Sequence, residues 1–281
     1  MLRDLDRRWV FLLMFLAVMV PLLLSVSFPE EPTPMVREVF KTIENLPSGS
    51  RVLMAYDYDP GSKGELDPMA AAFTRHCAEK GHRMYFITLW PFGGPMLDKS
   101  IALIEAEYPN ARLHYDYVSF GYKAGNEGPI KQLAVNIADL ASTDTRGAGL
   151  STIPMLDGVK SIADMDLVIS VSAGDPGTKQ WVQYATTPLG KPLVAGVTGV
   201  QAPDLYPYIP KQLIGLLGAI KGAAEYEHVL IEAYPNLASN PKARDGLRRM
   251  GPQLVAHILI VVLIILANII YFVGRRRGEF K

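Results

Sequence analysis

The feature that most constrains this chain is an uncharged apolar run near its C-terminal end. Residues 254–273 read LVAHILIVVLIILANIIYFV, and only His257 and Asn268 are polar. A helix of this length matches the hydrocarbon core of a membrane. Tyr271 and Phe272 stand where an interfacial aromatic belt is found, and Arg275–Arg277 follow as a basic stop. The sequence therefore predicts a transmembrane helix over 251–274 and a basic cytoplasmic tail over 275–281.

A second apolar stretch, at residues 9–28, reads WVFLLMFLAVMVPLLLSVSF. It suits either an uncleaved membrane anchor or a secretory signal, because Ser25-Val26-Ser27 is an acceptable cleavage site. Its length and the interfacial position of Trp9 favour the anchor. The short tail 1–8 carries Arg3, Arg7 and Arg8, which favour the cytoplasm. We expect residues 29–250 to lie on the extracytoplasmic side of a bacterial cytoplasmic membrane.

The net charge supports this division of the chain. Lys plus Arg and Asp plus Glu each number 28, but the two ends hold seven of the basic residues and only three of the acidic ones. The enclosed part is therefore mildly acidic, which argues against a nucleic-acid partner. The predicted orientation of the second span is less well supported, because a basic cluster lies on its outer side. This cluster consists of Lys242, Arg244, Arg248 and Arg249. This cluster could contact anionic lipid headgroups or form a solvated helix face.

The enclosed region alternates between apolar strand patterns and helical patterns. Strands are predicted over 51–56, 83–90, 112–120, 166–173 and 192–200. Thr33 and Pro34 are expected to cap the first helix of the domain, and residues 210–233 to form its last helix. This pattern predicts a doubly wound α/β domain with a mostly parallel, five-stranded sheet of flavodoxin or Rossmann type. The expected strand order is 2-1-3-4-5, and the loop 142–154 is a candidate lid or partner contact.

Ligands of an open parallel sheet bind at the carboxyl ends of the strands, so the loops that follow the strands carry the candidate site. These loops are rich in glycine and polar side chains. The candidate ligand-binding residues are Asp57, Asp59, Glu65, Gly93, Gly94, Asn126, Glu127, Gly174, Asp175, Gly177, Thr178 and Thr198.

Three roles are open for the first loop. Its carboxylates could bind a metal ion, hold the loop by hydrogen bonds or contact an organic ligand. The spacing does not fit an EF-hand, and Asp67 is better placed as a helix N-cap. At Gly174–Thr178, backbone amides could hold an anion, or Thr178 could be a plain cap. No catalytic or nucleotide-binding motif is present, Cys77 is a lone cysteine, and we predict neither a metal nor a cofactor.

Several strings in the enclosed region resemble a bacterial family of membrane-anchored α/β proteins with no assigned biochemical function. They are YDYDPGSKGELDP, SFGYKAGNEG, VSAGDPGTKQWVQYA and GVTGVQAPDLYPY followed by GLLGAIKGAAEYE. The resemblance covers nearly the whole enclosed region. It implies that the loops named above belong together, and it transfers no catalytic role.

These observations favour a non-enzymatic protein: a ligand-binding or accessory subunit of a membrane complex. Its expected partners are the lipid bilayer and either another membrane protein or further copies of itself. The alternative is an enzyme that acts on a small polar or anionic substrate at the carboxyl edge of the sheet. That alternative predicts a deep pocket there, with a carboxyl group of raised pKa. A third interpretation makes the domain a spacer in a larger complex.

Overall fold

The computed structural model describes residues 6–24 and 31–276. The chain separates into two compact units, and residues Glu30–Gly246 form the α/β unit. Its sheet contains six strands: β1 Arg51–Asp57, β2 Arg83–Thr88, β3 Tyr117–Tyr122, β4 Leu167–Ser172, β5 Leu193–Val197 and β6 Gly215–Gly218. All neighbouring strands are parallel. This confirms the predicted class, a parallel sheet flanked by helices.

The strand order differs from the prediction. It is β3-β2-β1-β4-β5-β6, the Rossmann order, whereas we expected the third strand to lie beside the first. The central pairing is between β1 and β4, from Val52 opposite Leu167 to Asp57 opposite Ser172. Strand order depends on which buried faces meet over long sequence separations, and the local patterns that locate strands do not encode it.

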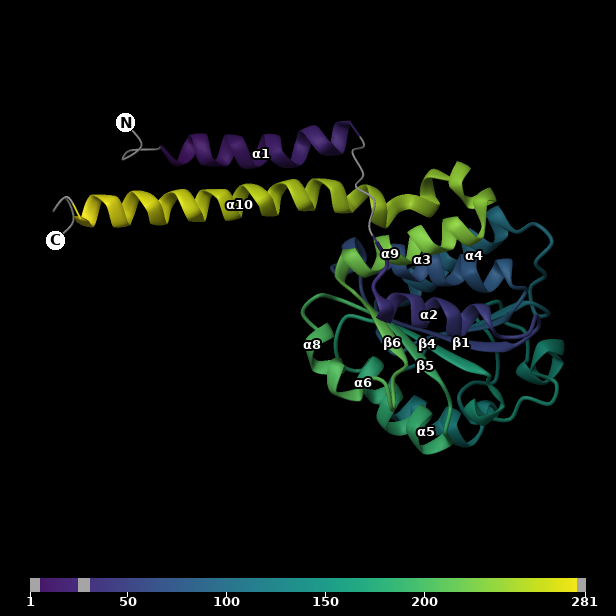
Figure 1. Cartoon of the computed structure of the whole chain (residues 1–281). Coiled ribbons are helices and arrows are strands. Elements are labelled where there is room, and N and C mark those ends of the chain that lie inside the picture. The colour runs from purple at the N-terminus through teal and green to yellow at the C-terminus, as the bar shows by residue number, and fades with distance from the viewer. Residues whose placement is uncertain (1–5, 25–30, 277–281) are drawn as a thin grey trace. The chain divides into compact units, whose positions relative to one another are not determined.

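Helices cover both faces of the sheet (Figure 1). On one face lie α2 Pro34–Glu44, α3 Lys63–Glu79, α4 Gly94–Glu107 and α9 Ala219–Ala233. On the other lie α5 Gly128–Val135, α6 Thr178–Trp181, the π-helical turn η5 Val182–Thr186, α7 Thr187–Leu189 and α8 Ala202–Leu205. Short 3₁₀ turns complete the unit: η1 Ile137–Asp139, η2 Leu150–Thr152, η3 Pro154–Leu156, η4 Ile162–Asp164, η6 Tyr206–Tyr208, η7 Pro235–Ser239 and η8 Pro241–Arg244.

Strand β1 shows why both faces are covered. Leu53 and Ala55 belong to the core cluster that also contains Trp181 of α6. The alternate residue Tyr56 points to the opposite face, where its hydroxyl donates to the carbonyl of Ala70 in α3 at 3.0 Å. Successive side chains of a strand point to opposite faces, so a strand that is apolar at nearly every position must be buried on both.

The sixth strand lies within a segment for which we predicted one helix. Residues 210–233 instead form β6, followed by α9 from Ala219. Gly215 begins β6 where α2 approaches closely, because a Cβ on Gly215 would lie 3.0 Å from Val39 and 3.1 Å from the carbonyl of Met35. Gly215 and Gly218, which fall within the predicted helix, therefore lie in a strand, and Gly222 lies in the following helix. Buried four-residue strands of this kind have no alternating pattern to mark them.

Helix α9 holds both ends of the α/β unit. Thr33 caps α2 as predicted, and its backbone N–H and hydroxyl also donate to Glu225, at 3.0 and 2.7 Å. The backbone N–H of Gly246 donates to Glu227 at 3.0 Å. Both carboxylates are buried. The first and last segments of the unit are thus fastened within one turn of the same helix.

The candidate lid at 142–154 is packed onto the unit. Asp144 accepts hydrogen bonds from the N–H groups of Arg146 and Ala148, and from His114 at 2.7 Å. Thr145 donates its N–H to the carbonyl of Ser119 in the edge strand β3. The segment therefore covers an exposed sheet edge, which parallel sheets require in order to avoid pairing with other chains.

The second unit contains the apolar helices. The helical stretch Pro241–Arg276, which includes α10 Asp245–Arg276, is the one helix among residues 6–24 and 31–276 that is long and apolar enough to span a membrane. The N-terminal helix α1, Arg7–Leu23, has 17 residues and contains Pro21. It is shorter than the roughly 20 residues that a hydrocarbon core requires, so the predicted N-terminal span is not found. Residues 25–28 of that span and 277–281 of the predicted tail lie outside the described part.

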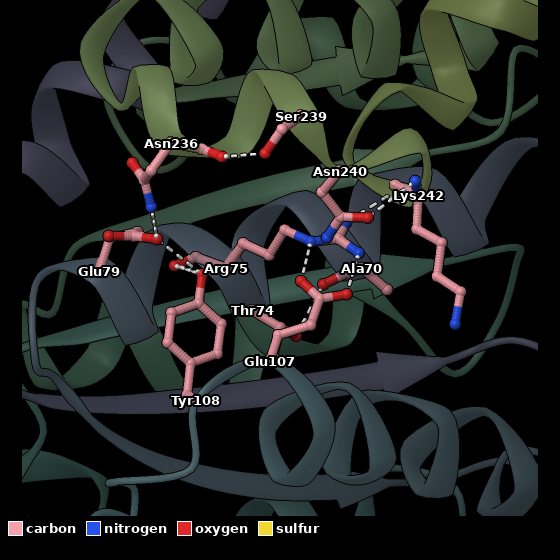
Figure 2. A network of polar contacts seen from close by, with 10 residues as sticks. All are labelled: Ala70, Thr74, Arg75, Glu79, Glu107, Tyr108, Asn236, Ser239, Asn240 and Lys242. Atoms are coloured by element: carbon pink, nitrogen blue, oxygen red, sulfur yellow. Dashed lines mark hydrogen bonds and ion pairs between the residues drawn. The ribbon is translucent and has the colours of Figure 1, made fainter.

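A buried ion pair joins the helical layer to the segment that leads into α10 (Figure 2). Nε and Nη2, on one edge of the Arg75 guanidinium in α3, donate to the two carboxylate oxygens of Glu107 at the end of α4, each at 2.8 Å. A third donor of Arg75 reaches the carbonyl of Lys242 in η8 at 3.2 Å. Burial opposes ionisation of Glu107, but the hydrogen bonds and charge of Arg75 hold its pKa below the usual value. Arg75 therefore ties three elements together.

We expect Arg75→Met to lower the free energy of unfolding by about 3 kcal/mol, because it leaves the partly buried Glu107 without its partner. Arg146→Met is the matched control. Arg146 pairs with Glu105 at the same distance of 2.8 Å, but both side chains are exposed, so the expected loss is below about 1 kcal/mol. Denaturant unfolding of the full chain in detergent micelles measures both, and equal losses would contradict the role given to Arg75.

Candidate functional site

The candidate site lies where the strand order reverses, between β1 and β4. From β1 the chain adds β2 and β3 on one side, and from β4 it adds β5 and β6 on the other. The loops that leave the carboxyl ends of these two strands diverge, which is where open α/β sheets bind their ligands. Asp57 ends β1 and Ser172 ends β4, and the two residues are paired in register.

The carboxyl group of Asp57 is fully buried at this point. One oxygen accepts the backbone N–H of Leu89 after β2, at 2.7 Å. The other accepts the indole N–H of Trp181 in α6, also at 2.7 Å. Burial raises the pKa of Asp57 to about 7, although these two hydrogen bonds act in the opposite direction. Asp57 thus links the loops on either side of the reversal, and neither oxygen faces solvent.

A chain of hydroxyl groups lies beneath the β4–α6 loop. Thr178 Oγ1 is 2.9 Å from Ser170 Oγ and 2.8 Å from Ser172 Oγ. Ser172 donates to the side-chain oxygen of Gln201 at 2.9 Å, and the amide group of Gln201 donates to the carbonyl of Gly174 at 3.1 Å. Each hydroxyl has a partner, and Ser172 Oγ also accepts the N–H of Thr178. Thr178 therefore has a structural role, but it is the first residue of α6 and not its N-cap, which is Gly177.

Tryptophan side chains occupy the space between the diverging loops. Trp90, after β2, donates its indole N–H to the carbonyl of Pro176 at 2.7 Å. Its ring lies against Gly174, where an added Cβ would be 3.6 Å away. Gly177 is packed still more tightly, because a Cβ there would lie 2.3 Å from the carbonyl of Gly174. The loops that could have held a phosphate are therefore in direct contact with Trp90 or with each other.

The other predicted carboxylates hold the first loop together. Asp59 accepts the N–H groups of Gly61 and Ser62, which is the geometry of a turn before a helix. Glu65 accepts the N–H of Gly199, after β5, at 2.9 Å. Asp67 does not cap a helix, because α3 begins at Lys63, and its carboxylate instead binds Tyr58 and Lys99. These contacts match the structural interpretation of the loop.

Some predicted residues lie apart from this centre. Asn126 and Glu127 follow the edge strand β3, which β2 separates from β1, and Glu127 pairs with Lys131 in its own helix. Gly93 and Gly94 begin α4, where a Cβ on Gly93 would clash with Thr88. Asp175 is exposed on the β4–α6 loop, and Thr198 is buried after β5. In the described part of the chain, no group of three His, Cys, Asp or Glu side chains could hold a metal ion.

Sequence reasoning missed Trp90, Trp181 and Gln201, which organise the site. Trp90 is the last residue of the predicted strand 83–90, so its place at the carboxyl edge could have been noticed. Trp181 and Gln201 meet their partners Asp57 and Ser172 across 124 and 29 residues, and no local pattern reports such pairs.

Two exposed apolar side chains lie on the loops that leave this edge of the sheet, and we call them the apolar rim. We use this name for Phe92 in the β2–α4 loop and Val200 in the β5–α8 loop, which are 69% and 90% exposed. The loops that carry them are connected through the β4–α6 loop by the hydrogen bonds of Trp90 and Gln201 described above. Two large apolar side chains are thus presented to solvent on a connected set of loops.

The buried carboxyl of Asp57 predicts a specific pH dependence. The folded state holds the proton of Asp57 more tightly than the unfolded chain does, because its pKa rises from 3.8 to about 7. The contribution of Asp57 to stability is therefore fully present below pH 3.8 and falls as the pH rises to about 7. His76 acts in the opposite sense, because burial lowers its pKa from 6.5 to about 4.

The variant Asp57→Asn separates the two effects, since it leaves His76 in place. Between pH 4 and pH 7 we expect the unfolding free energy of the natural protein, relative to that of the variant, to fall by roughly 3 kcal/mol. Denaturant titrations of the full chain in micelles across this range measure the difference. Parallel curves for the two proteins would show that Asp57 does not titrate as described.

Comparison with known proteins adds little to this geometry. No family model and no curated protein sequence matches the chain. Two of the solved structures that match this chain are described as the crystal structure of AibC and as trehalose-6-phosphate synthase OtsA. AibC is 12% identical, and the match covers 79% of this chain and 50% of AibC. OtsA is 10% identical, and the match covers 84% of this chain and 44% of OtsA. The TM-score is 0.33 in both cases. The chain spans about half the length of each, and neither likeness carries an argument about function.

Proposed function

We propose that this protein is a membrane-anchored accessory subunit whose α/β unit binds a partner protein through the apolar rim. The observation that carries the proposal is the contrast at the carboxyl edge of the sheet. The centre of the edge is filled by Trp90 and by the hydrogen-bonded Asp57, while Phe92 and Val200 are exposed on loops that leave this edge. Aromatic side chains are enriched at protein interfaces, and the surrounding hydrogen bonds hold the loop of Phe92 on a rigid support.

In this proposal, α10 is the membrane anchor. It carries Arg248 and Arg249 before its apolar stretch and Arg275 and Arg276 at its end, so its own charges do not define its direction. The N-terminal apolar segment supplies the direction, because the basic residues Arg3, Arg7 and Arg8 precede it. In this proposal the segment acts as a secretory signal, whose apolar core is shorter than a membrane span, and it directs the α/β unit to the extracytoplasmic side of a bacterial cytoplasmic membrane.

The alternative function, an enzyme at the same edge, has one observation in its favour. Asp57 has the raised pKa that an acid–base group requires. However, its side chain is completely buried and both oxygens accept N–H groups, so a substrate would first have to displace Leu89 or Trp181 from it. A cavity of about 350 Å³ lies instead at the opposite edge of the sheet, where α3 and α4 end and β2 begins. We therefore favour the accessory role.

Site-specific photo-crosslinking tests the partner surface. We expect a photoreactive amino acid at position 92 or 200 to form a covalent product of one mass with the same protein, identified by mass spectrometry in membranes of the source cells. The matched control is position 135 in α5, because Val135 is 76% exposed but lies outside the rim. The same product at all three positions, or no product at 92 and 200, would argue against the rim as an interface.

Cysteine labelling tests the side of the membrane. The native Cys77 is fully buried, and burial raises the pKa of its thiol, so it should not react. We expect Val135→Cys to react with a membrane-impermeant maleimide in intact spheroplasts, while the natural chain stays unlabelled. Labelling of the variant only after lysis would place the α/β unit in the cytoplasm and overturn this part of the proposal.

A further inference from the structure

The two polar residues of the apolar run in α10 lie on one face of the helix. Within residues 254–273 these are His257 and Asn268, which stand eleven positions apart. Eleven residues complete three turns of an α-helix to within about 20°. Val261 and Ile264 lie between them on the same face and continue a spacing of four, three and four residues, which is the spacing of a helix–helix seam. We call these four residues the α10 seam.

The α10 seam is exposed along its whole length. Val261 and Ile264 are each 55% exposed, and His257 and Asn268 are exposed as well. None of the residues in the most apolar stretch of the helix is buried. In a membrane, this face must therefore meet either lipid or another helix.

Asn268 makes lipid a poor partner for this face. It lies five residues before the end of the run, about 7 Å along the helix axis, so its short side chain stays within the hydrocarbon. Its amide group donates to the carbonyl of Ile264 at 2.8 Å, and this is the one hydrogen bond of the side chain to residues that the structure describes. A carboxamide has two N–H donors and an acceptor oxygen, so one N–H and the oxygen remain. Such groups are unfavourable in hydrocarbon until they are paired.

A second copy of α10 supplies the groups that this amide lacks. All copies of one chain enter the membrane in the same orientation, so two α10 helices run parallel and hold their Asn268 side chains at the same depth. The remaining N–H of each amide can then donate to the oxygen of the other, which is an arrangement with twofold symmetry. The same register brings the two His257 side chains together, and a neutral imidazole also has one donor and one acceptor.

The other apolar helix of the chain does not offer these groups. Helix α1 is shorter than a membrane span, and after Arg8 its one polar side-chain group is the indole N–H of Trp9. An indole can donate but cannot accept, so it would leave the second N–H of Asn268 without a partner. The complementary amide has to come from a second molecule.

We propose that two copies of this chain pair in the membrane through the α10 seam, with the Asn268 side chains hydrogen-bonded across the pair. The proposal rests on the role of α10 as the membrane anchor in the proposed function, and it is independent of the apolar rim. The opposite face of α10, which includes Leu266, stays in contact with lipid.

Disulfide cross-linking in membranes of cells that express the full chain tests the seam. Val261→Cys places a thiol on it, and Val262→Cys is the matched control, because Val262 is 44% exposed but points about 100° away. The native Cys77 is buried, and burial raises the pKa of its thiol, so it should not react. We expect oxidation to give a product of twice the chain mass in much higher yield from Val261→Cys. Equal yields, or a main product of another mass, would overturn the proposal.

Sedimentation equilibrium of the full chain in density-matched micelles measures the contribution of the amide. Asn268→Leu removes the amide and keeps a similar size, and it should raise the dissociation constant of the dimer about fivefold or more. Asn268→Gln keeps an amide and should raise this constant less. A dissociation constant that Asn268→Leu leaves unchanged would contradict pairing through Asn268.

Extraction with alkaline carbonate separates a failure of the pairing from a failure of the anchor. We expect the chain to remain in the membrane fraction. Its release would overturn the anchor role, and with it both the proposed function and the pairing. Retention together with equal cross-linking at positions 261 and 262 would overturn the pairing alone.

Discussion

The structure depends on one buried carboxyl group, that of Asp57. A carboxyl group in the interior is tolerated only where hydrogen-bond donors are fixed around it. Here the donors come from opposite sides of the strand-order reversal, from Leu89 after β2 and from Trp181 after β4. Asp57 therefore holds together the two halves of the sheet at the point where their loops would otherwise separate. This requirement accounts for the tight glycines and the tryptophans at the same place.

The filled reversal point changes what the fold can do. In most sheets of this order the diverging loops leave a crevice, and binding there defines the function. Here the loops are bonded to one another through Trp90 and Gln201, so the edge is a rigid surface with Phe92 and Val200 exposed on it. A rigid surface with exposed apolar side chains suits recognition of a folded partner, since few side chains must be ordered on binding.

Much of the fold could be predicted from the sequence, because strands that are buried on both faces read as short apolar runs between helices. The five runs and the cap at Thr33 were recognisable in this way. β6 was not, because a strand of four residues with a glycine at each end is too short to show a period. The strand order and the partners of Asp57 also escaped prediction, because both depend on contacts between distant segments. The predicted loops do leave the carboxyl ends of the strands, but the complete burial of Asp57, with both carboxylate oxygens hydrogen-bonded, is not visible in the sequence.

The fastening of Thr33 and Gly246 to Glu225 and Glu227 has a mechanical consequence. Tension applied to the α/β unit through either connecting segment would be borne first by two carboxylates on a single turn of α9. The path between these two contacts runs through α9 and includes no strand of the described unit. The hydrogen bonds of the sheet and the loops at its carboxyl edge would therefore carry no tension. A force applied at these two segments would therefore act on α9 and leave the carboxyl edge of the sheet undeformed.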